Sequence, residues 1–234
     1  MSRKHYKHLF FDLDKTLWDF KTNSFETLKE IYSKHLQPII NGNNFETFLK
    51  VYDFNNNNLW EGYRKGTITK ETLRIERFLL TLNEFDIQNE TLANNIADDY
   101  EKLSPLKTSL FPFAKETLEY LFTKYKLHII TNGFKEVQYP KLKHTGLIKY
   151  FTEIIISEDT GYMKPDKNIF LYSLGKAKAI ATESLMIGDD YDVDIVGAQA
   201  VGMDQVLFSP EKLFNGDNIT YKISSLIELK EILK

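Results

Sequence analysis

Two aspartates lie two residues apart, directly after a short apolar run near the start of the chain. The segment reads Phe11-Asp12-Leu13-Asp14-Lys15-Thr16-Leu17. Neighbouring carboxylates repel each other, so we expect a cation or a proton between them. A solvated loop that carries two acids is the alternative, and this motif alone does not decide between the two.

Polar groups also follow three later apolar runs. Thr131-Asn132-Gly133 offers a hydroxyl and a turn whose amides can face an anion. In Lys164-Pro165 the proline restricts the backbone of the lysine. Gly188-Asp189-Asp190 is followed closely by Asp192 and Asp194, which makes four acids in six residues. Such a loop beside an apolar strand is costly without a cation, so we favour a metal site over a solvated acidic loop.

The hydrophobic pattern predicts the elements that hold these groups. In the C-terminal half, short apolar runs alternate with helical patterns, which predicts a doubly wound parallel α/β sheet. Such sheets bind ligands at the carboxyl ends of their strands. The expected strands are Leu9–Leu13, Leu127–Thr131, Ile154–Ser157, Leu185–Ile187 and Val206–Phe208. The expected helices include Phe113–Tyr125, with Pro112 in its first turn, and Lys167–Lys178, with Asp166 as its N-cap.

The chain between Thr22 and Leu103 shows helical patterns alone. Gly66 followed by Thr69 predicts the end of one helix and the N-cap of the next. The Asn55–Asn58 run is expected on a solvated helix face or in a turn. We therefore predict two domains, an α/β core of residues 1–18 and 106–234 and a helical insertion of residues 19–105.

The composition excludes several classes of function. The 234 residues carry 30 Lys and Arg against 33 Asp and Glu, a formal net charge of −3, which disfavours nucleic acid polymers and membrane surfaces as partners. The chain has no cysteine, so oxygen-ligated hard cations are the metals we expect. We also expect no signal peptide and no membrane span, and a cytoplasmic protein.

Together, the four motifs resemble the haloacid dehalogenase (HAD) superfamily in its Mg-dependent phosphatase branch. They occur in the family's order along the whole chain: Asp12-Leu13-Asp14-Lys15-Thr16, Thr131-Asn132, Lys164-Pro165, and Gly188-Asp189-Asp190 through Asp194. The family's C1 cap enters between the first two motifs, where the helical insertion lies. Only 32 residues separate Thr131 from Lys164, too few for a large second cap. The resemblance thus implies a Rossmann-like core with an inserted helical cap.

The resemblance also implies a role for each motif residue. Asp12 would be the nucleophile that forms an aspartyl-phosphate, and Asp14 the general acid and base. Mg²⁺ would be held by the Asp12 carboxylate, the Asp14 backbone carbonyl and Asp189. The phosphoryl group would be bound by Thr131, Asn132 and Lys164. Asp190 and Asp194 would lie just outside the metal ligands, and Asp194 would orient the metal's water or Lys164 rather than bind the metal directly.

A finer resemblance points to the noncanonical pyrimidine 5'-nucleotidase subfamily. It rests on Leu59-Trp60-Glu61-Gly62-Tyr63, Gly66-Thr67-Ile68-Thr69, Thr131-Asn132-Gly133-Phe134 and Ser157-Glu158. It implies pyrimidine nucleoside 5'-monophosphates as substrates, with the base read by cap residues. Our candidates are Asn56, Trp60 and Tyr63, and packing within the cap is the alternative for the two aromatic residues. The Asn55–Asn58 run departs from the subfamily pattern, as does Pro140, which we expect to affect a helix end.

Other activities share parts of this pattern. A phosphatase or phosphomutase acting on sugar or two-carbon phosphates would use every core residue. A haloacid dehalogenase is disfavoured because members of that branch lack the second acid of the first motif, here Asp14. A non-catalytic regulatory HAD protein usually loses a nucleophile or a metal acid, and this chain keeps all of them. The oligomeric state is left open.

Overall fold

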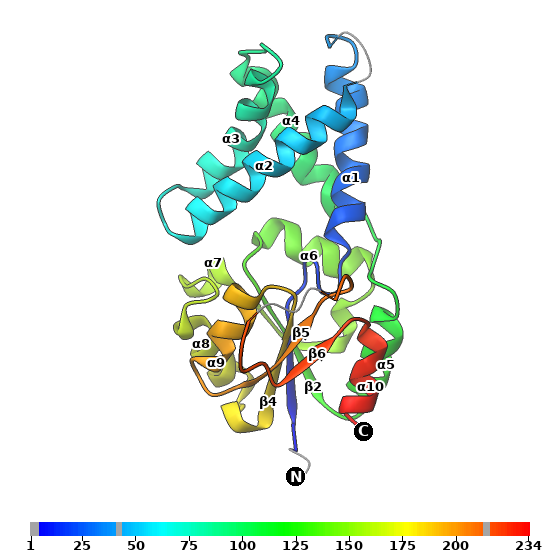
Figure 1. Ribbon diagram of the computed structural model, residues 1–234, viewed down its shortest axis with the longest axis vertical. Coiled ribbons are helices and arrows are strands. Elements are labelled where there is room, and N and C mark those ends of the chain that lie inside the picture. The colour runs from blue at the N-terminus through cyan, green and yellow to red at the C-terminus, as the bar shows by residue number, and fades with distance from the viewer. Residues whose placement is uncertain (1–4, 41–43, 213–215) are drawn as a thin grey trace. The chain divides into compact units, whose positions relative to one another are not determined.

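The computed structural model describes residues 5–40, 44–212 and 216–234, and the chain forms two compact units. The core unit comprises Met1–Phe20 and Thr108–Lys234, and the helical unit comprises Lys21–Lys107. Figure 1 shows the sheet of the core unit and the helices of the helical unit. The domain boundaries predicted from the sequence, after residues 18 and 105, lie two residues before the boundaries of these units.

The core unit is built on a parallel sheet, whose described strands run in the order β3-β2-β1-β4-β5-β6. The strands are β1 (His8–Phe11), β2 (Lys126–Thr131), β3 (Phe151–Ile156), β4 (Ser184–Gly188), β5 (Asp204–Phe208) and β6 (Tyr221–Ile223). Phe11, the last residue of β1, pairs with Ile129 on one side and Ile187 on the other. The residues that follow β1, β2 and β4 therefore emerge at one edge of the sheet.

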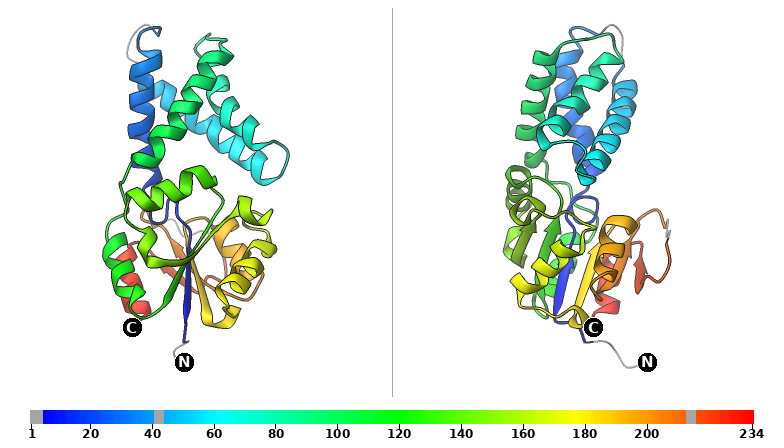
Figure 2. Two further views of the ribbon diagram at one scale, coloured as in Figure 1. Left: turned by 180° about the vertical axis from the view of Figure 1, so that it is seen from behind. Right: turned by 90° about the vertical axis from the view of Figure 1, so that its left-hand side faces the viewer.

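Helices cover both faces of this sheet (Figure 2). They are α5 (Ala114–Phe122), α6 (Lys135–His144), α7 (Ser157–Thr160), α8 (Lys167–Ala177), α9 (Val196–Gln199) and α10 (Leu229–Ile232). Because side chains alternate along a strand, Leu9 and Phe11 of β1 belong to the apolar cluster that contains α5 and α10 residues. Phe10 between them belongs to the cluster with α8 and α9. The fully buried β1 thus anchors both layers.

Several expected elements differ from the observed ones at their ends. The strand expected over Ile154–Ser157 runs over Phe151–Ile156, and Ser157 begins α7. The three-residue β6 was missed, because Tyr221-Lys222-Ile223 is too short a run, and is interrupted by a lysine, to give an apolar signal. The helix expected from Phe113 begins at Ala114, since Phe113 has a left-handed φ of 65° and lies outside it. Pro112 is therefore not in the first turn of α5.

Pro140 was expected to affect a helix end, and this prediction is wrong. It lies inside α6, where the helix continues for four more residues to His144. Proline removes one backbone donor and disfavours a helix interior, yet α6 continues through Pro140. By contrast, the predicted cap Asp166 is confirmed, since its side chain accepts a hydrogen bond from the N–H of Asn168 at 2.8 Å.

The helical unit contains four α-helices among its described residues. They are α1 (Phe20–Ile31), which continues into a π-helical turn over Tyr32–Leu36, α2 (Phe45–Arg64), α3 (Lys70–Asn83) and α4 (Glu90–Leu103). Their buried faces form a cluster rich in aromatic rings, including Phe48, Tyr52, Phe78 and Tyr100. Across the described part of the chain, no helix is both long and apolar enough to cross a membrane.

The α2–α3 connection follows the prediction. Gly66 adopts a positive φ of 68° after α2 ends, and Thr69 caps α3 by accepting a hydrogen bond from the N–H of Thr72 at 3.1 Å. Glycine adopts this left-handed conformation without the cost that a side chain adds. The turn therefore sets where α3 begins.

We expect Thr69→Ala to lower the free energy of unfolding by about 1 kcal/mol, the usual cost of losing an N-cap. Urea unfolding followed by tryptophan fluorescence would measure this, with Trp60 reporting on the helical unit. Ser33→Ala, at an exposed site of the same unit, serves as the matched control. Equal stability of the two variants would contradict the capping role.

Candidate active site

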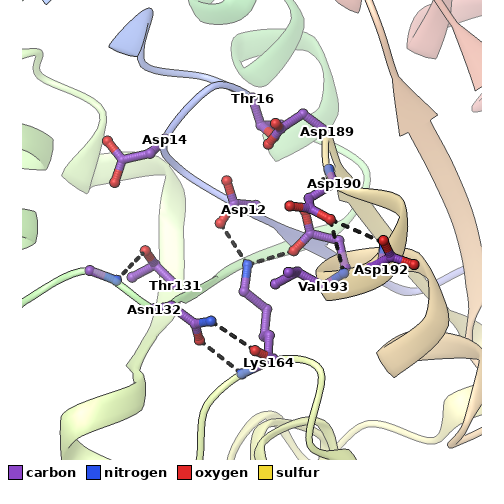
Figure 3. Close-up of polar contacts among 12 residues, drawn as sticks. Asp12, Asp14, Thr16, Thr131, Asn132, Lys164, Asp189, Asp190, Asp192 and Val193 are labelled. Atoms are coloured by element: carbon purple, nitrogen blue, oxygen red, sulfur yellow. Dashed lines mark hydrogen bonds and ion pairs between the residues drawn. The ribbon is translucent and has the colours of Figure 1, made fainter. Parts of the chain in front are cut away.

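The four motifs meet at one edge of the core sheet (Figure 3). Asp12 follows β1, Thr131 ends β2, Lys164 lies in the loop before α8, and Asp189 follows β4. The backbone N–H of Asp12 still donates to the carbonyl of Ile187 at 2.9 Å, so the sheet itself fixes where this residue leaves the strand. Strand order brings Asp12, Thr131 and Asp189 together, and hydrogen bonds from Asn132 hold the backbone of Lys164 beside them.

Lys164 lies between two buried carboxylates. Its Nζ is 2.6 Å from Oδ1 of Asp12 and 2.6 Å from Oδ1 of Asp194. All three side chains are almost fully buried. Burial disfavours the charge on Lys164, but the two aspartates outweigh this effect and raise its pKa. The ammonium group is therefore a fixed positive charge at the floor of the site.

Three carboxylates at this edge could hold a cation. Oxygen atoms of Asp12, Asp189 and Asp194 all lie within 4.8 Å of one another. Burial raises the pKa of Asp12 to about 7, with Lys164 opposing the shift and Asp194 adding to it. Burial also raises the pKa values of Asp189 and Asp194. Oxygen donors suit a hard divalent cation such as Mg²⁺, whose positive charge would offset the cost of ionising these buried carboxylates.

The acidic loop after β4 is shaped to place Asp194. A Cβ atom on Gly188 would lie 2.2 Å from Oδ2 of Asp194, so glycine leaves room for that carboxylate against the strand. Oδ1 of Asp190 accepts hydrogen bonds from the N–H groups of Asp192 and Val193 and caps the short turn that follows. The loop thus brings Asp194 into contact with the ammonium group of Lys164, whereas the side chain of Asp190 caps the turn.

Thr16 of the first motif contacts the acidic loop that follows β4. Its hydroxyl donates to Oδ1 of Asp189 at 3.2 Å, and its side chain is fully buried. This threonine belongs to the first motif, but the motif itself predicted no role for it. The contact ties the loop after β1 to the loop after β4, which aligns Asp189 with Asp12.

Thr131 at the end of β2 and Asn132 directly after it differ in what they can bind. The hydroxyl oxygen of Thr131 accepts hydrogen bonds from the N–H of Gly133 and from Nε2 of Gln138, which leaves its proton to donate to an anion. The amide of Asn132 instead pairs with the backbone N–H and carbonyl of Lys164 at 2.8 and 2.9 Å. A contact from Asn132 to phosphate would therefore have to come from its backbone N–H.

Asp14 points away from the acidic cluster in Figure 3. Its two oxygens accept hydrogen bonds from Lys141 and Gln138, both on α6. Neither donor was singled out from the sequence. Their spacing of three residues on the helix after the second motif was the available signal, since it places both on one helix face.

The three predicted specificity residues all lie on α2 of the helical unit. Asn56 is buried, and its Oδ1 accepts a long hydrogen bond of 3.4 Å from Nη1 of Arg77. This placement favours a packing role for Asn56 over the predicted role in reading a base. Trp60 and Tyr63 are partly exposed, and their rings meet edge to face with centroids 5.8 Å apart.

A doubly wound sheet with clustered acids and a buried lysine at its carboxyl edge defines an α/β enzyme whose site suits an anionic substrate and a cation. A model of the haloacid dehalogenase-like hydrolases matches residues 9–208. The chain therefore belongs to the HAD-like hydrolase family, and the fold class and the family resemblance drawn from the sequence are confirmed.

Relatives match nearly the whole chain. It is 30% identical to the HAD hydrolase YfnB of Bacillus subtilis, over 98% of this chain and 96% of that protein. It is 32% identical to the pyrimidine 5'-nucleotidase YjjG of Escherichia coli over 96% of each, and 28% identical to the pyrimidine 5'-nucleotidase PynA of Streptococcus pneumoniae over 97% and 95%. The crystal structure of YfnB bound to magnesium superposes with a TM-score of 0.88 and 29% identity, over 98% of this chain and 99% of that one.

The raised pKa of Asp12 predicts that the stabilising effect of Mg²⁺ depends on pH. In the folded chain this pKa is about 7, whereas an unfolded aspartate has a pKa of about 3.9. The stability contributed by the bound proton is therefore complete below about pH 4 and is lost as the pH rises through about 7. Mg²⁺ needs the ionised carboxylates, so its effect should grow over the same range.

We expect added Mg²⁺ to raise the melting temperature more at about pH 8 than at about pH 5.5. Thermal melts with and without MgCl₂ at both values would measure this. Asp192→Asn, which changes an exposed acid of the same loop, should keep the difference. An equal increment at both pH values would contradict proton competition at the site.

Proposed function

We propose that the protein is a Mg²⁺-dependent phosphatase that hydrolyses small phosphate monoesters through an aspartyl-phosphate on Asp12. The observation that carries this proposal is the buried Asp12 carboxylate, paired with Lys164 within an oxygen-only cluster of acids. Phosphate monoesters are dianions, and their transfer requires neutralisation of the phosphoryl oxygens. A fixed lysine and a cation site beside one carboxylate supply that charge.

In the first step an oxygen of Asp12 attacks phosphorus. The new bond joins this oxygen to phosphorus, the bond from phosphorus to the ester oxygen breaks, and the leaving oxygen takes a proton from Asp14. Lys164 and the hydroxyl of Thr131 would bind phosphoryl oxygens as their negative charge shifts. Lys164 stays in place because Asn132 fixes its backbone and Asp194 its ammonium group.

In the second step a water molecule attacks the phosphoryl group on Asp12. Asp14 takes a proton from this water, the bond between Asp12 and phosphorus breaks, and inorganic phosphate is released. Asp14 is thereby protonated again, and Asp12 returns as a carboxylate. The cycle balances in protons, because the proton given to the leaving group is recovered from water.

Mg²⁺ would be held by the carboxylates of Asp12 and Asp189 and by the backbone carbonyl of Asp14. When bound, it neutralises negative charge on the phosphoryl oxygens. Asp194 lies in the same cluster, but Lys164 occupies its Oδ1 and the N–H of Asp190 contacts its Oδ2. We therefore assign Asp194 to Lys164 rather than to the metal.

We assign pyrimidine nucleoside 5'-monophosphates as the preferred substrates and the helical unit as the cap that selects them. The similarity of this chain to the pyrimidine 5'-nucleotidases YjjG and PynA, which extends over nearly its full length, supports this choice. The core residues recognise the phosphate, so recognition of the base must come from other side chains. Trp60 and Tyr63 offer partly exposed aromatic surface suited to a flat ring.

Asp12→Asn should abolish both turnover and phosphorylation of the enzyme, because the nucleophile is lost. Phosphate release and trapping of the phosphoenzyme at low temperature would measure the two effects. Asp192→Asn is the matched control and should remain active. Turnover by Asp12→Asn within a few-fold of wild type would remove Asp12 from this role.

Chelation of Mg²⁺ should also abolish phosphate release by the wild type, and added Mg²⁺ should restore it.

A substrate panel should show higher kcat/KM for dUMP, UMP or dTMP than for purine nucleotides or sugar phosphates. Tyr63→Ala should raise KM for these nucleotides while hydrolysis of 4-nitrophenyl phosphate stays near wild type, since the phosphate site is untouched. Phe54→Ala, which removes an exposed ring from the same helix, provides the control. Equal losses on both substrates would show that Tyr63 does not read the base.

A further inference from the structure

Two side chains of α6 hold the carboxylate of Asp14 at both of its oxygens. Nζ of Lys141 donates to Oδ1 at 2.5 Å, and Nε2 of Gln138 donates to Oδ2 at 2.7 Å. The contacts cross more than 120 positions in the sequence and join the loop after β1 to the helix after β2. With both oxygens held by donors from one helix, the carboxylate is fixed in direction as well as in place.

Both donors are buried, which is unusual for residues of their type. Gln138 is fully buried and Lys141 is 4% exposed. Long polar side chains are rarely buried unless they satisfy a specific partner. Nζ of Lys141 also lies 4.0 Å from the ring centroid of Trp18. The backbone of Trp18 forms an isolated parallel β-bridge with that of Asp14. The ammonium group is thus confined between the aromatic ring and the carboxylate.

Gln138 also reaches the proposed phosphate site. The same Nε2 that donates to Asp14 donates to the hydroxyl of Thr131 at 2.7 Å. A Cβ atom on Gly133 would lie 2.4 Å from Cδ of Gln138, so glycine is what allows this close approach. One amide therefore sets the spacing between the phosphate-binding hydroxyl and the proton-transferring carboxylate.

We infer that Gln138 and Lys141 are positioning residues that hold Asp14 where it transfers protons, an inference that rests on the proposed phosphatase activity. An in-line displacement puts the leaving oxygen on the side of phosphorus opposite the attacking oxygen of Asp12. The acid that protonates it must therefore stand apart from Asp12, as Asp14 does in Figure 3. A proton donor works only within hydrogen-bond reach of its acceptor, so its direction has to be fixed.

The choice of leaving group separates this role from a purely structural one. The nitrophenolate of 4-nitrophenyl phosphate departs without a proton, whereas the alkoxide of benzyl phosphate needs one. The value of kcat/KM reports the steps through formation of the phosphoenzyme, in which Asp14 acts as the acid. Displacing Asp14 should therefore lower kcat/KM for benzyl phosphate and spare that for 4-nitrophenyl phosphate.

The test compares Lys141→Met and Gln138→Met with wild type on these two substrates. General acid–base catalysis typically contributes about 10²–10⁴-fold, and we expect each variant to lose roughly tenfold or more on benzyl phosphate. Activity of Lys141→Met on 4-nitrophenyl phosphate should stay near wild type in kcat/KM. Gln138→Met also loses the contact to Thr131, so its kcat/KM for 4-nitrophenyl phosphate should fall, but by much less than its kcat/KM for benzyl phosphate. Lys143→Met, an exposed lysine of the same helix, should match wild type on both substrates.

A second readout follows the second step, in which Asp14 takes a proton from water. In the variants this hydrolysis should become slower than formation of the phosphoenzyme. Rapid mixing with 4-nitrophenyl phosphate should then release a burst of nitrophenolate close to one equivalent per enzyme. A role confined to stabilising the fold would lower the active fraction and the melting temperature without creating a burst.

Gly133→Ala provides an independent variant that leaves both donors in the chain. The added methyl group displaces the end of the Gln138 side chain, so the same difference between the two substrates is expected, together with any general loss from the phosphate turn. Equal losses on both substrates in all three variants, or unchanged activity on benzyl phosphate, would overturn the inference while the wild-type phosphoenzyme kept the proposed function intact. A wild type that forms no phosphoenzyme would overturn both.

Discussion

The burial of several carboxylates at one sheet edge is the constraint on which the rest of the structure depends. Asp12, Asp189 and Asp194 lie close enough together to repel, and burial opposes their ionisation. Lys164 offsets part of this negative charge through its two short contacts. The surrounding loops then serve to hold that lysine, through Asn132 at its backbone and through the space at Gly188 that admits Asp194.

The apolar core around the parallel sheet offsets the cost of burying these charged groups. Its central strands β1, β2 and β4 carry apolar residues that are almost completely buried, in clusters on both faces of the sheet. The acidic residues and Lys164 lie beyond the carboxyl ends of the strands, where segments 152 residues apart, such as those of Asp12 and Lys164, come into direct contact. The apolar layers thus stabilise the fold, and the edge can hold charges that in isolation would destabilise it.

The residues of the site that belong to short motifs near strand ends can be predicted from the sequence. Asp12, Thr131, Lys164 and Asp189 each follow an apolar run, and parallel strands bring such positions to one edge whatever the details of packing. Gln138 and Lys141 carry no such signal, because a glutamine and a lysine on a polar helix are ordinarily exposed. Their burial depends on how α6 packs against the loop of Asp14, a tertiary contact that local patterns do not specify. The contact between Asn56 and the buried Arg77 on another helix is likewise a tertiary contact that local patterns do not specify.

The contacts of α6 show how a site can be precise although much of it lies on loops. Asp14 lies in the loop after β1, whereas Thr131 is the last residue of β2, where it pairs with Ile156 of β3. Gln138 bonds both side chains from a helix, and Lys141 bonds the first of them one turn later. A helix is stiffer than a loop, so it transfers its own rigidity to two groups that must keep a fixed separation. The precision of the proposed proton transfer is therefore set by the packing of α6, and the motif aspartate alone does not determine it.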